Sequence, residues 1–190
     1  NNTNTSLSRT FSVNEEPSVT LVAPPNGTRN NIAEQNFTFI PNDNSGIISN
    51  CSVVFNGLLN VSNDTMIEGD YNNITVSTLQ HRQYNWTVNC TDPSGNTGIN
   101  TTPSILYVDR VGPYINLTTP YSSQTFNTDD ILFNFTATDQ FNFLVNLTCN
   151  LTLDRGVNVS NIIVESGSHN ATLIENLSQG SHTWNVTCKD

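Results

Sequence analysis

The segment Trp86-Thr87-Val88-Asn89-Cys90-Thr91-Asp92 is repeated 98 residues later as Trp184-Asn185-Val186-Thr187-Cys188-Lys189-Asp190. Apolar and polar residues alternate through both copies, as they do along a β-strand that has one face on a core and one in solvent. Recurrence of one strand at a fixed interval indicates two copies of the same domain.

Further matches extend the repeat over most of the chain. Pro17-Ser18-Val19-Thr20-Leu21 aligns with Pro113-Tyr114-Ile115-Asn116-Leu117 at an offset of 96, and Asp43 aligns with Asp139 at the same offset. The cysteines align at an offset of 98, which places a two-residue insertion between Asp139 and Cys149. We therefore predict domains at residues 15–110 and 111–190, preceded by an N-terminal extension at residues 1–14.

Within each copy, short alternating segments are separated by Asn, Gly, Asp and Pro, and no stretch has a helical period. About seven such segments in a repeat of this length predict an all-β protein of two tandem immunoglobulin-like antiparallel sandwiches. Trp86 and Trp184 are the expected core residues. For the first copy, we expect strands A, B, C, E, F and G at residues 18–24, 36–43, 49–56, 72–79, 83–91 and 101–109, with residues 57–71 left unassigned.

The second copy contains counterparts of strands A to F but none of strand G. Thr10-Phe11-Ser12-Val13-Asn14 parallels the strand G sequence Ile105-Leu106-Tyr107-Val108-Asp109, and each precedes a proline that begins a domain. We therefore expect the N-terminal extension to contain a donor-type strand. Leu7, Phe11 and Val13 are its candidate core-filling residues.

The four cysteines fall in two pairs with identical spacing. Repeat symmetry favours Cys51–Cys90 and Cys149–Cys188, each joining strands C and F within one sheet and stabilising its domain by roughly 2–4 kcal/mol. Disulfides of this kind indicate an extracellular compartment. Four free thiols are the less favoured alternative, and the histidines lack the spacing of a zinc site.

The charge balance excludes several classes of partner. Only 12% of residues are charged, and the net charge is −10 with a single lysine. A protein with so few basic residues is not expected to bind nucleic acid. No apolar run approaches the ~20 residues that cross a membrane. The chain has no signal peptide or initiator methionine, so we expect either a mature product or part of a longer protein.

Acceptor sequences for N-linked glycans are unusually frequent. Random placement of the 31 Asn and the 43 Ser and Thr residues would give about seven N-x-S/T sequences. Asparagine is a poor strand former, so its repeated use on outward positions favours extensive N-glycosylation over a merely polar outer face. Asn36 and Asn50 adjoin expected core positions, where a glycan would be crowded. The nineteen candidate sites are Asn1, Asn4, Asn26, Asn36, Asn50, Asn60, Asn63, Asn73, Asn85, Asn89, Asn100, Asn116, Asn134, Asn146, Asn150, Asn158, Asn170, Asn176 and Asn185.

Signatures of catalysis are absent from the sequence, and we expect neither an enzyme nor a cofactor apart from covalent glycans. Asp129-Asp130 and Asp92-Pro93-Ser94-Gly95-Asn96 could supply calcium ligands at a domain junction. For the second segment, a hairpin turn built by Asp, Pro and Gly is the favoured interpretation. Catalytic and metal residues are therefore both expected to be none.

The motifs P-x-V-x-L-x-x-P, W-x-V-x-C-x-D and V-D-x-x-x-P resemble immunoglobulin-like repeats of prokaryotic cell-surface proteins, archaeal ones especially. The resemblance implies a cell-surface location. Together with the missing strand, it favours a glycosylated subunit of a pilus-like or thread-like filament that polymerises head to tail with copies of itself by donor-strand complementation. The alternative is a stalk segment of a longer adhesin or S-layer-type envelope protein built from covalent repeats.

Overall fold

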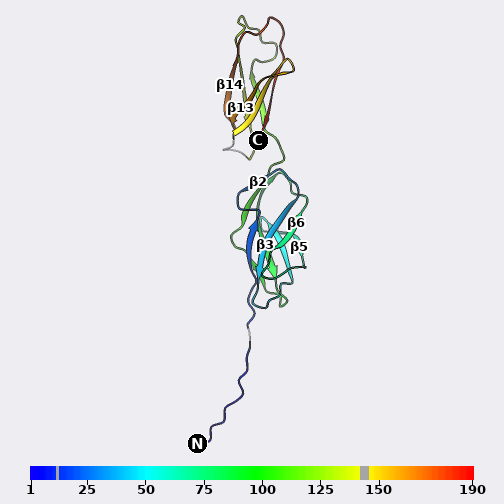
Figure 1. Cartoon of the computed structure of the whole chain (residues 1–190), viewed down its shortest axis with the longest axis vertical. Coiled ribbons are helices and arrows are strands. Elements are labelled where there is room, and N and C mark those ends of the chain that lie inside the picture. The colour runs from blue at the N-terminus through cyan, green and yellow to red at the C-terminus, as the bar shows by residue number, and fades with distance from the viewer. Residues whose placement is uncertain (12, 142–145) are drawn as a thin grey trace. The chain divides into compact units, whose positions relative to one another are not determined.

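The computed structural model describes residues 1–11, 13–141 and 146–190. The chain divides into two compact units, Asn1–Arg110 and Val111–Asp190 (Figure 1). All regular elements of the described residues are β-strands, which confirms the predicted all-β sandwich class. Within these residues, no helix is long and apolar enough to cross a bilayer.

A small antiparallel sheet forms one face of the first unit. Its strand order is β1-β3-β6, with bounds β1 (Ser18–Ala23), β3 (Gln35–Asn42) and β6 (Asn72–Val76). Alternation along β3 turns Phe37 and Phe39 to the core, where neither is exposed, and leaves Asn36 in solvent. The period-two pattern therefore specifies which face of the sheet is buried.

A larger sheet of order β2-β9-β7-β4-β5 forms the other face, with β8 paired to β7. β2 is parallel to β9, and the other pairs are antiparallel. The bounds are β2 (Thr28–Asn30), β4 (Asn50–Phe55), β5 (Leu58–Asn63), β7 (Arg82–Thr91), β8 (Thr97–Ile99) and β9 (Ser104–Val108).

Aromatic rings fill the space between these sheets. Phe37 meets Trp86 edge to face with ring centroids 5.0 Å apart, and Phe55 lies 5.3 Å from Phe37. Such pairs contribute about 0.5–1.5 kcal/mol beyond the burial of their surface. Trp86 has no exposed surface, so the tryptophan of the repeated segment lies at the centre of the first core.

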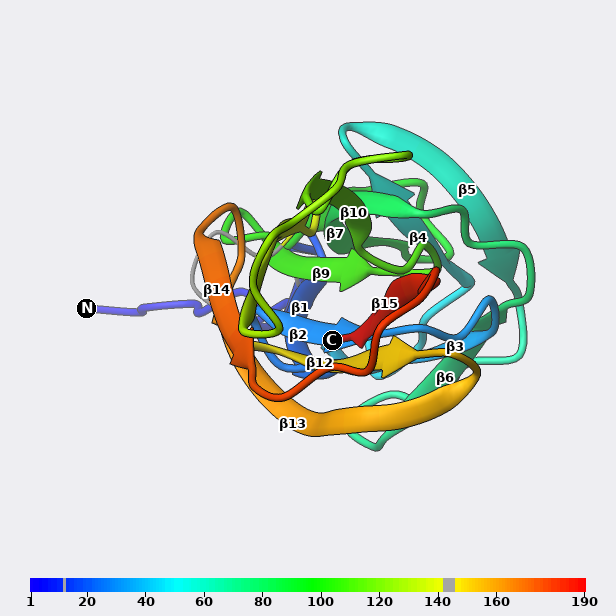
Figure 2. The ribbon, with the colours of Figure 1, turned by 90° about the horizontal axis from the view of Figure 1, so that it is seen from above.

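The second unit repeats this plan with fewer strands. One sheet has the order β10-β11-β14 and the other has the order β13-β12-β15; Figure 2 shows β12 and β15 in the end view. The bounds are β10 (Tyr114–Thr119), β11 (Ile131–Thr138), β12 (Asn146–Leu153), β13 (Gly156–Glu165), β14 (His169–Ile174) and β15 (Trp184–Lys189).

The second core is built from the equivalent positions. Phe133 and Phe135 on β11 are buried, as are Leu147 and Leu151 on β12. Trp184 differs from Trp86 because it is only half-buried and packs at the margin of the core. The second sandwich is therefore less completely enclosed at its repeated tryptophan than the first.

Both predicted disulfides are confirmed: Cys51 is bonded to Cys90 and Cys149 to Cys188. In each pair the two cysteines lie directly opposite on neighbouring strands, β4 with β7 and β12 with β15. The bridges therefore lie within one sheet, unlike the bridge that crosses the core of antibody domains. Each closes a loop with a sequence separation of 39.

Strands β1, β3, β4 and β7 match the predicted A, B, C and F strands to within one residue at each end. β2 and β8, each three residues long, are not among the predicted strands. β5 lies in the unassigned residues 57–71, although Asn56-Gly57 forms the β4–β5 turn with φ of 52° and 83°, as expected for a hairpin Asn-Gly. β6 begins where the predicted strand E begins but ends three residues earlier, at Val76. Beyond it, the Leu79 amide donates a hydrogen bond to the Ala33 carbonyl outside the sheet. The predicted two-residue insertion falls between Asp139 and Cys149, a stretch that contains residues 142–145, which lie outside the described residues.

Gly98 provides a test of the packing where the chain enters the first unit. A Cβ added at Gly98 would lie 1.6 Å from the backbone oxygen of Pro17, so we expect Gly98→Ala to lower the free energy of unfolding by about 1–3 kcal/mol. Gly112→Ala is the control, because a Cβ there meets nothing within 4 Å. Denaturant unfolding compares the two variants, and equal midpoints would show that the Pro17 contact is unimportant.

Candidate functional site: the unpaired edge of the second unit

Strand β9 completes the sandwich of the first unit. It runs antiparallel to β7, with Leu106 opposite Tyr84 and Val108 opposite Arg82. Leu106 and Val108 point into the core and have no exposed surface. β9 thus pairs with residues 82–86 on one edge of β7 and closes the core beneath them, while β8 pairs with residues 89–91 of the same strand.

The second unit has no equivalent of β9 among the described residues. Its sheet β13-β12-β15 corresponds to the β5-β4-β7 part of the larger sheet, so β15 occupies the place of β7. β15 pairs with β12 on one side, and no described strand pairs with its other edge. An unpaired strand edge of this kind presents a row of backbone donors and acceptors that can accept another strand.

A cavity of about 940 Å³ adjoins this edge. Apolar residues form its floor, most of them buried or half-buried, and polar residues at 121–128 and 178–183 form much of its rim. The apolar lining residues include Leu117, Ile131, Phe133, Leu153, Leu177 and Trp184. The second core is therefore accessible where Leu106 and Val108 seal the first.

Trp184 is held at the edge of this cavity by two contacts. Its ring meets Phe133 edge to face at 5.1 Å between centroids, and its indole Nε1 donates a hydrogen bond to the Pro120 carbonyl oxygen at 3.0 Å. Tryptophan commonly shows one apolar side and one satisfied polar atom at binding surfaces. An incoming side chain would therefore meet a fixed aromatic wall.

A histidine and a carboxylate form an ion pair on the rim. His182 Nδ1 lies 2.6 Å from Asp154 Oδ2, and His182 Nε2 lies 2.9 Å from the Ser178 carbonyl oxygen. Both hydrogen bonds raise the pKa of His182 above its ordinary value, and the bond to Asp154 has the larger effect. The hydrogen bond from His182, followed by that from the Thr183 amide, lowers the pKa of Asp154.

Sequence reasoning did not single out His182. At an offset of 98 it replaces Tyr84, which is 3% exposed in the first core. A polar, titratable residue thus replaces a buried aromatic one. This replacement is the sequence feature that could have indicated different surroundings at this position in the second unit. The predicted core residue Trp184 and the unpredicted His182 both line the cavity.

The N-terminal residues proposed as a donor strand are exposed. Leu7, Phe11 and Val13 are 93%, 90% and 71% exposed, and the described part of residues 1–14 forms no strand. Figure 1 shows this segment as an extended trace outside the sandwich of the first unit. Three large apolar side chains are thus presented to solvent on a segment whose sequence resembles β9.

None of the nineteen candidate glycosylation asparagines is buried. Asn36 is exposed and Asn50 is half-buried, so only the second remains partly enclosed. The buried Asn72, by contrast, is not in an acceptor sequence. In two half-buried sites the side-chain nitrogen donates within the fold: Asn100 to the Val19 carbonyl at 2.8 Å, and Asn134 to Thr119 Oγ1 at 2.9 Å.

The ion pair on the rim predicts a pH dependence of stability. The raised pKa of His182 contributes stability that is fully present below its ordinary value of 6.5 and is lost as the pH rises through the raised value. The lowered pKa of Asp154 contributes stability that is present above 3.8 and is lost as the pH falls through the lowered value. The contribution of the pair is therefore largest between these two pH limits.

To measure this contribution, thermal unfolding is compared for the wild type and His182→Gln at about pH 5.5 and about pH 8.5. We expect the wild type to have a higher unfolding temperature than His182→Gln at the lower pH. This difference in unfolding temperature should be smaller at the higher pH. His169→Gln, at an exposed position of β14, is the control and should show no such change. An unchanged difference between wild type and His182→Gln would contradict the ion pair.

Comparison with known proteins identifies no family for this chain. No family model matches the sequence, and no curated protein matches it. The fibronectin(III)-like modules of Clostridium thermocellum CbhA match in structure with a TM-score of 0.43 and 16% identity, over 90% of this chain and 85% of that one. The secreted serine protease VesC of Vibrio cholerae matches with a TM-score of 0.24 and 9% identity, over 90% of this chain and 46% of that one. Neither similarity is close enough to indicate a function.

Proposed function

We propose that this chain is a heavily N-glycosylated structural subunit of an extracellular filament. The N-terminal segment of one copy completes the second sandwich of the next copy, and the repetition of this contact builds the fibre. The observation that carries the proposal is the unpaired edge of β15 above an open apolar cavity, in a chain that also exposes Phe11 and Val13.

The first unit supplies the register of the proposed contact. Aligning Phe11 with Leu106 and Val13 with Val108 places them opposite the counterparts of Tyr84 and Arg82. At an offset of 98 these counterparts are His182 and Gly180. Phe11 would then enter beside His182, which lines the cavity as Gly180 does.

Burial of apolar surface provides the driving force. Complete burial of a large apolar side chain contributes about 1.5–3 kcal/mol, and Phe11 is 90% exposed in the free chain. Backbone hydrogen bonds along β15 add to this gain, since the edge groups exchange water for a strand partner.

Because the donor and acceptor surfaces are different parts of the chain, the contact is heterologous. A contact of this type leaves one free donor and one free acceptor after each addition, so it produces an open filament unless the rotation closes a ring. The two disulfides support an extracellular location. The chain would need no partner other than copies of itself.

Glycans would limit association to this one contact. Only 12% of residues are charged, and charge is a common means of preventing lateral pairing of strand edges. Asn60 on β5 and Asn158 on β13 are exposed acceptor sites on strands at sheet edges. Bulky hydrated sugars at such positions would block sideways contacts.

A covalent array is the second candidate. In the first unit, β9 comes from the same chain and is followed at once by the second unit. In a longer adhesin or envelope protein, a strand of the same polypeptide could close the second unit in the same way. The chain would then be a stalk segment, and its glycans would still protect its surface.

The first prediction of this proposal concerns peptide binding. A chain lacking residues 1–14 should form no filaments but should bind a peptide of residues 5–14 with one-to-one stoichiometry, with a rise in the unfolding temperature. Phe11→Asp in the peptide should weaken binding about tenfold or more, because it buries an unpaired charge. Thr10→Asp is the matched control, since alternation directs position 10 away from the core.

Calorimetry of the truncated chain with each peptide measures these affinities, and electron microscopy tests for filaments. Filaments that persist without residues 1–14 would contradict donor-strand assembly. Equal binding of the Phe11→Asp and wild-type peptides would also contradict it, because the side chain would then lie outside the cavity.

The second prediction concerns the distribution of glycans. We expect sugars on exposed acceptors such as Asn60, Asn116 and Asn158, and none on Asn100 or Asn134, whose side-chain nitrogens donate within the fold. The sugar is attached to this same nitrogen, so modification requires it to be accessible. Glycopeptide mass spectrometry of the native protein reports the occupied sites. Sugars on Asn100 and Asn134 with the exposed sites bare would show that accessibility in this fold does not govern modification.

A further inference from the structure

Each unit carries an aspartate immediately after the middle strand of the sheet that contains its first strand, β1-β3-β6 in the first unit and β10-β11-β14 in the second. Asp43 follows β3 and Asp139 follows β11. Each accepts a hydrogen bond at Oδ1 from the amide two residues later, Ser45 at 2.8 Å and Phe141 at 2.9 Å. In each, Oδ2 is inaccessible to solvent and has no hydrogen-bond partner among the described residues.

The energetic cost of the unpartnered oxygen is greatest at Asp139, because this residue is only 2% exposed. A buried carboxylate oxygen without a donor is costly, and buried polar atoms in native proteins nearly always have a partner. The repeated turn positions the same oxygen in both units, so its placement is a property of the fold. A bound cation is one partner that would satisfy it.

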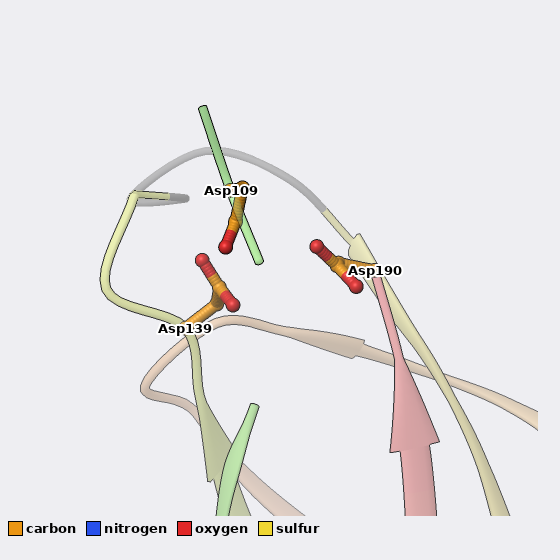
Figure 3. Close-up of side chains that lie close together, drawn as sticks. All are labelled: Asp109, Asp139 and Asp190. Atoms are coloured by element: carbon orange, nitrogen blue, oxygen red, sulfur yellow. The ribbon is translucent and has the colours of Figure 1, made fainter. Parts of the chain in front are cut away.

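A second carboxylate faces Asp139 within the same unit. Asp190 directly follows β15, and a carboxylate oxygen of Asp190 lies within 4.8 Å of one from Asp139. Figure 3 shows the two side chains turned toward each other. Asp109, also labelled there, belongs to the first unit, where its Oδ1 lies 3.2 Å from His81 Nδ1.

This separation suits a bridging calcium ion. Calcium binds carboxylate oxygens at about 2.3–2.6 Å, so one ion can contact two oxygens that are up to about 5 Å apart. Without a cation, the two charges would repel each other across a partly buried space. Zinc sites in proteins usually include histidine or cysteine ligands, and magnesium demands a stricter octahedral geometry. Calcium accepts carboxylates completed by backbone oxygens and water.

At the corresponding end of the first unit, the second carboxylate already has hydrogen-bond partners. Asp92, the counterpart of Asp190, accepts four hydrogen bonds: from the Ser94 amide, from the amide and side chain of Asn96, and from the side chain of Asn14. Burial alone would raise the pKa of Asp92, but the hydrogen bonds from Asn96, Ser94 and Asn14 outweigh it and hold the pKa below its ordinary value. Asp92 therefore stabilises a turn, and both of its carboxylate oxygens already accept hydrogen bonds.

We propose that Asp139 and Asp190 bind one calcium ion at the end of the second unit where β11 and β15 stop. The sequence analysis expects no metal, since nothing in the sequence distinguishes a buried, unpartnered Asp139 from a turn residue. The site does not depend on the filament proposal, because both ligands belong to one unit of one chain.

Calcium binding is tested on the full chain by calorimetry and by thermal unfolding, with calcium chloride compared against chelator. We expect one ion per chain, a dissociation constant of about 10⁻⁴–10⁻³ M as in extracellular modules, and a rise in the unfolding temperature that grows with calcium concentration. Asp139→Asn should abolish both effects. In chelator this variant should be at least as stable as the wild type, because it removes an uncompensated buried charge.

Asp43→Asn is the matched control, because Asp43 makes the same turn in the first unit, where Asp92, the counterpart of Asp190, already accepts four hydrogen bonds. We expect it to retain calcium binding and the calcium-dependent shift. Three results would each overturn the proposal: a wild type that gains no stability from calcium, an Asp139→Asn variant that still binds the ion, or a loss of binding in Asp43→Asn alone. Magnesium chloride at the same concentration separates specific binding from general screening of the net negative charge.

Discussion

The antiparallel pairing of β9 with β7 is the contact on which the rest of the structure depends. It pairs residues 82–86 on one edge of β7, and it brings Leu106 and Val108 over the aromatic core. The second unit has the same sheet partners and the same disulfide, but β15 has no described strand in that place. One missing pairing therefore accounts for the open edge, the exposed cavity and the incomplete burial of Trp184.

An open edge conflicts with solubility, and the chain shows how the conflict can be limited. With a single lysine and few other charges, it lacks the usual means of keeping strand edges apart. Many acceptor asparagines instead occupy exposed positions of strands and none of the nineteen is buried, whereas the buried Asn72 lies outside any acceptor sequence. Glycans at the exposed positions would shield the sides of the molecule and leave the edge of β15 as the accessible contact.

The fold could be predicted from sequence because its causes are local. Alternation specified β1, β3, β4 and β7, and the identical spacing of the cysteines specified both disulfides. The site could not be predicted fully, because its features depend on burial in three dimensions. His182 is the counterpart of Tyr84 in the repeat, but in the structure it lies just before β15, pairs with Asp154 and lines the cavity. Similarly, Asp43 and Asp139 read as ordinary turn residues until the structure shows that one oxygen of each is enclosed without a partner.

The central claim is that the edge of β15 accepts the N-terminal segment of another copy. A near-atomic electron-microscopy map of the native assembled material tests it most directly, because the path of the chain across the edge can be traced. The account predicts an antiparallel strand beside β15 and the residues that precede it, with the Phe11 side chain opposite His182 and the backbone continuing into a different molecule. An empty edge, or a strand that continues from Asp190 of the same molecule, would contradict it.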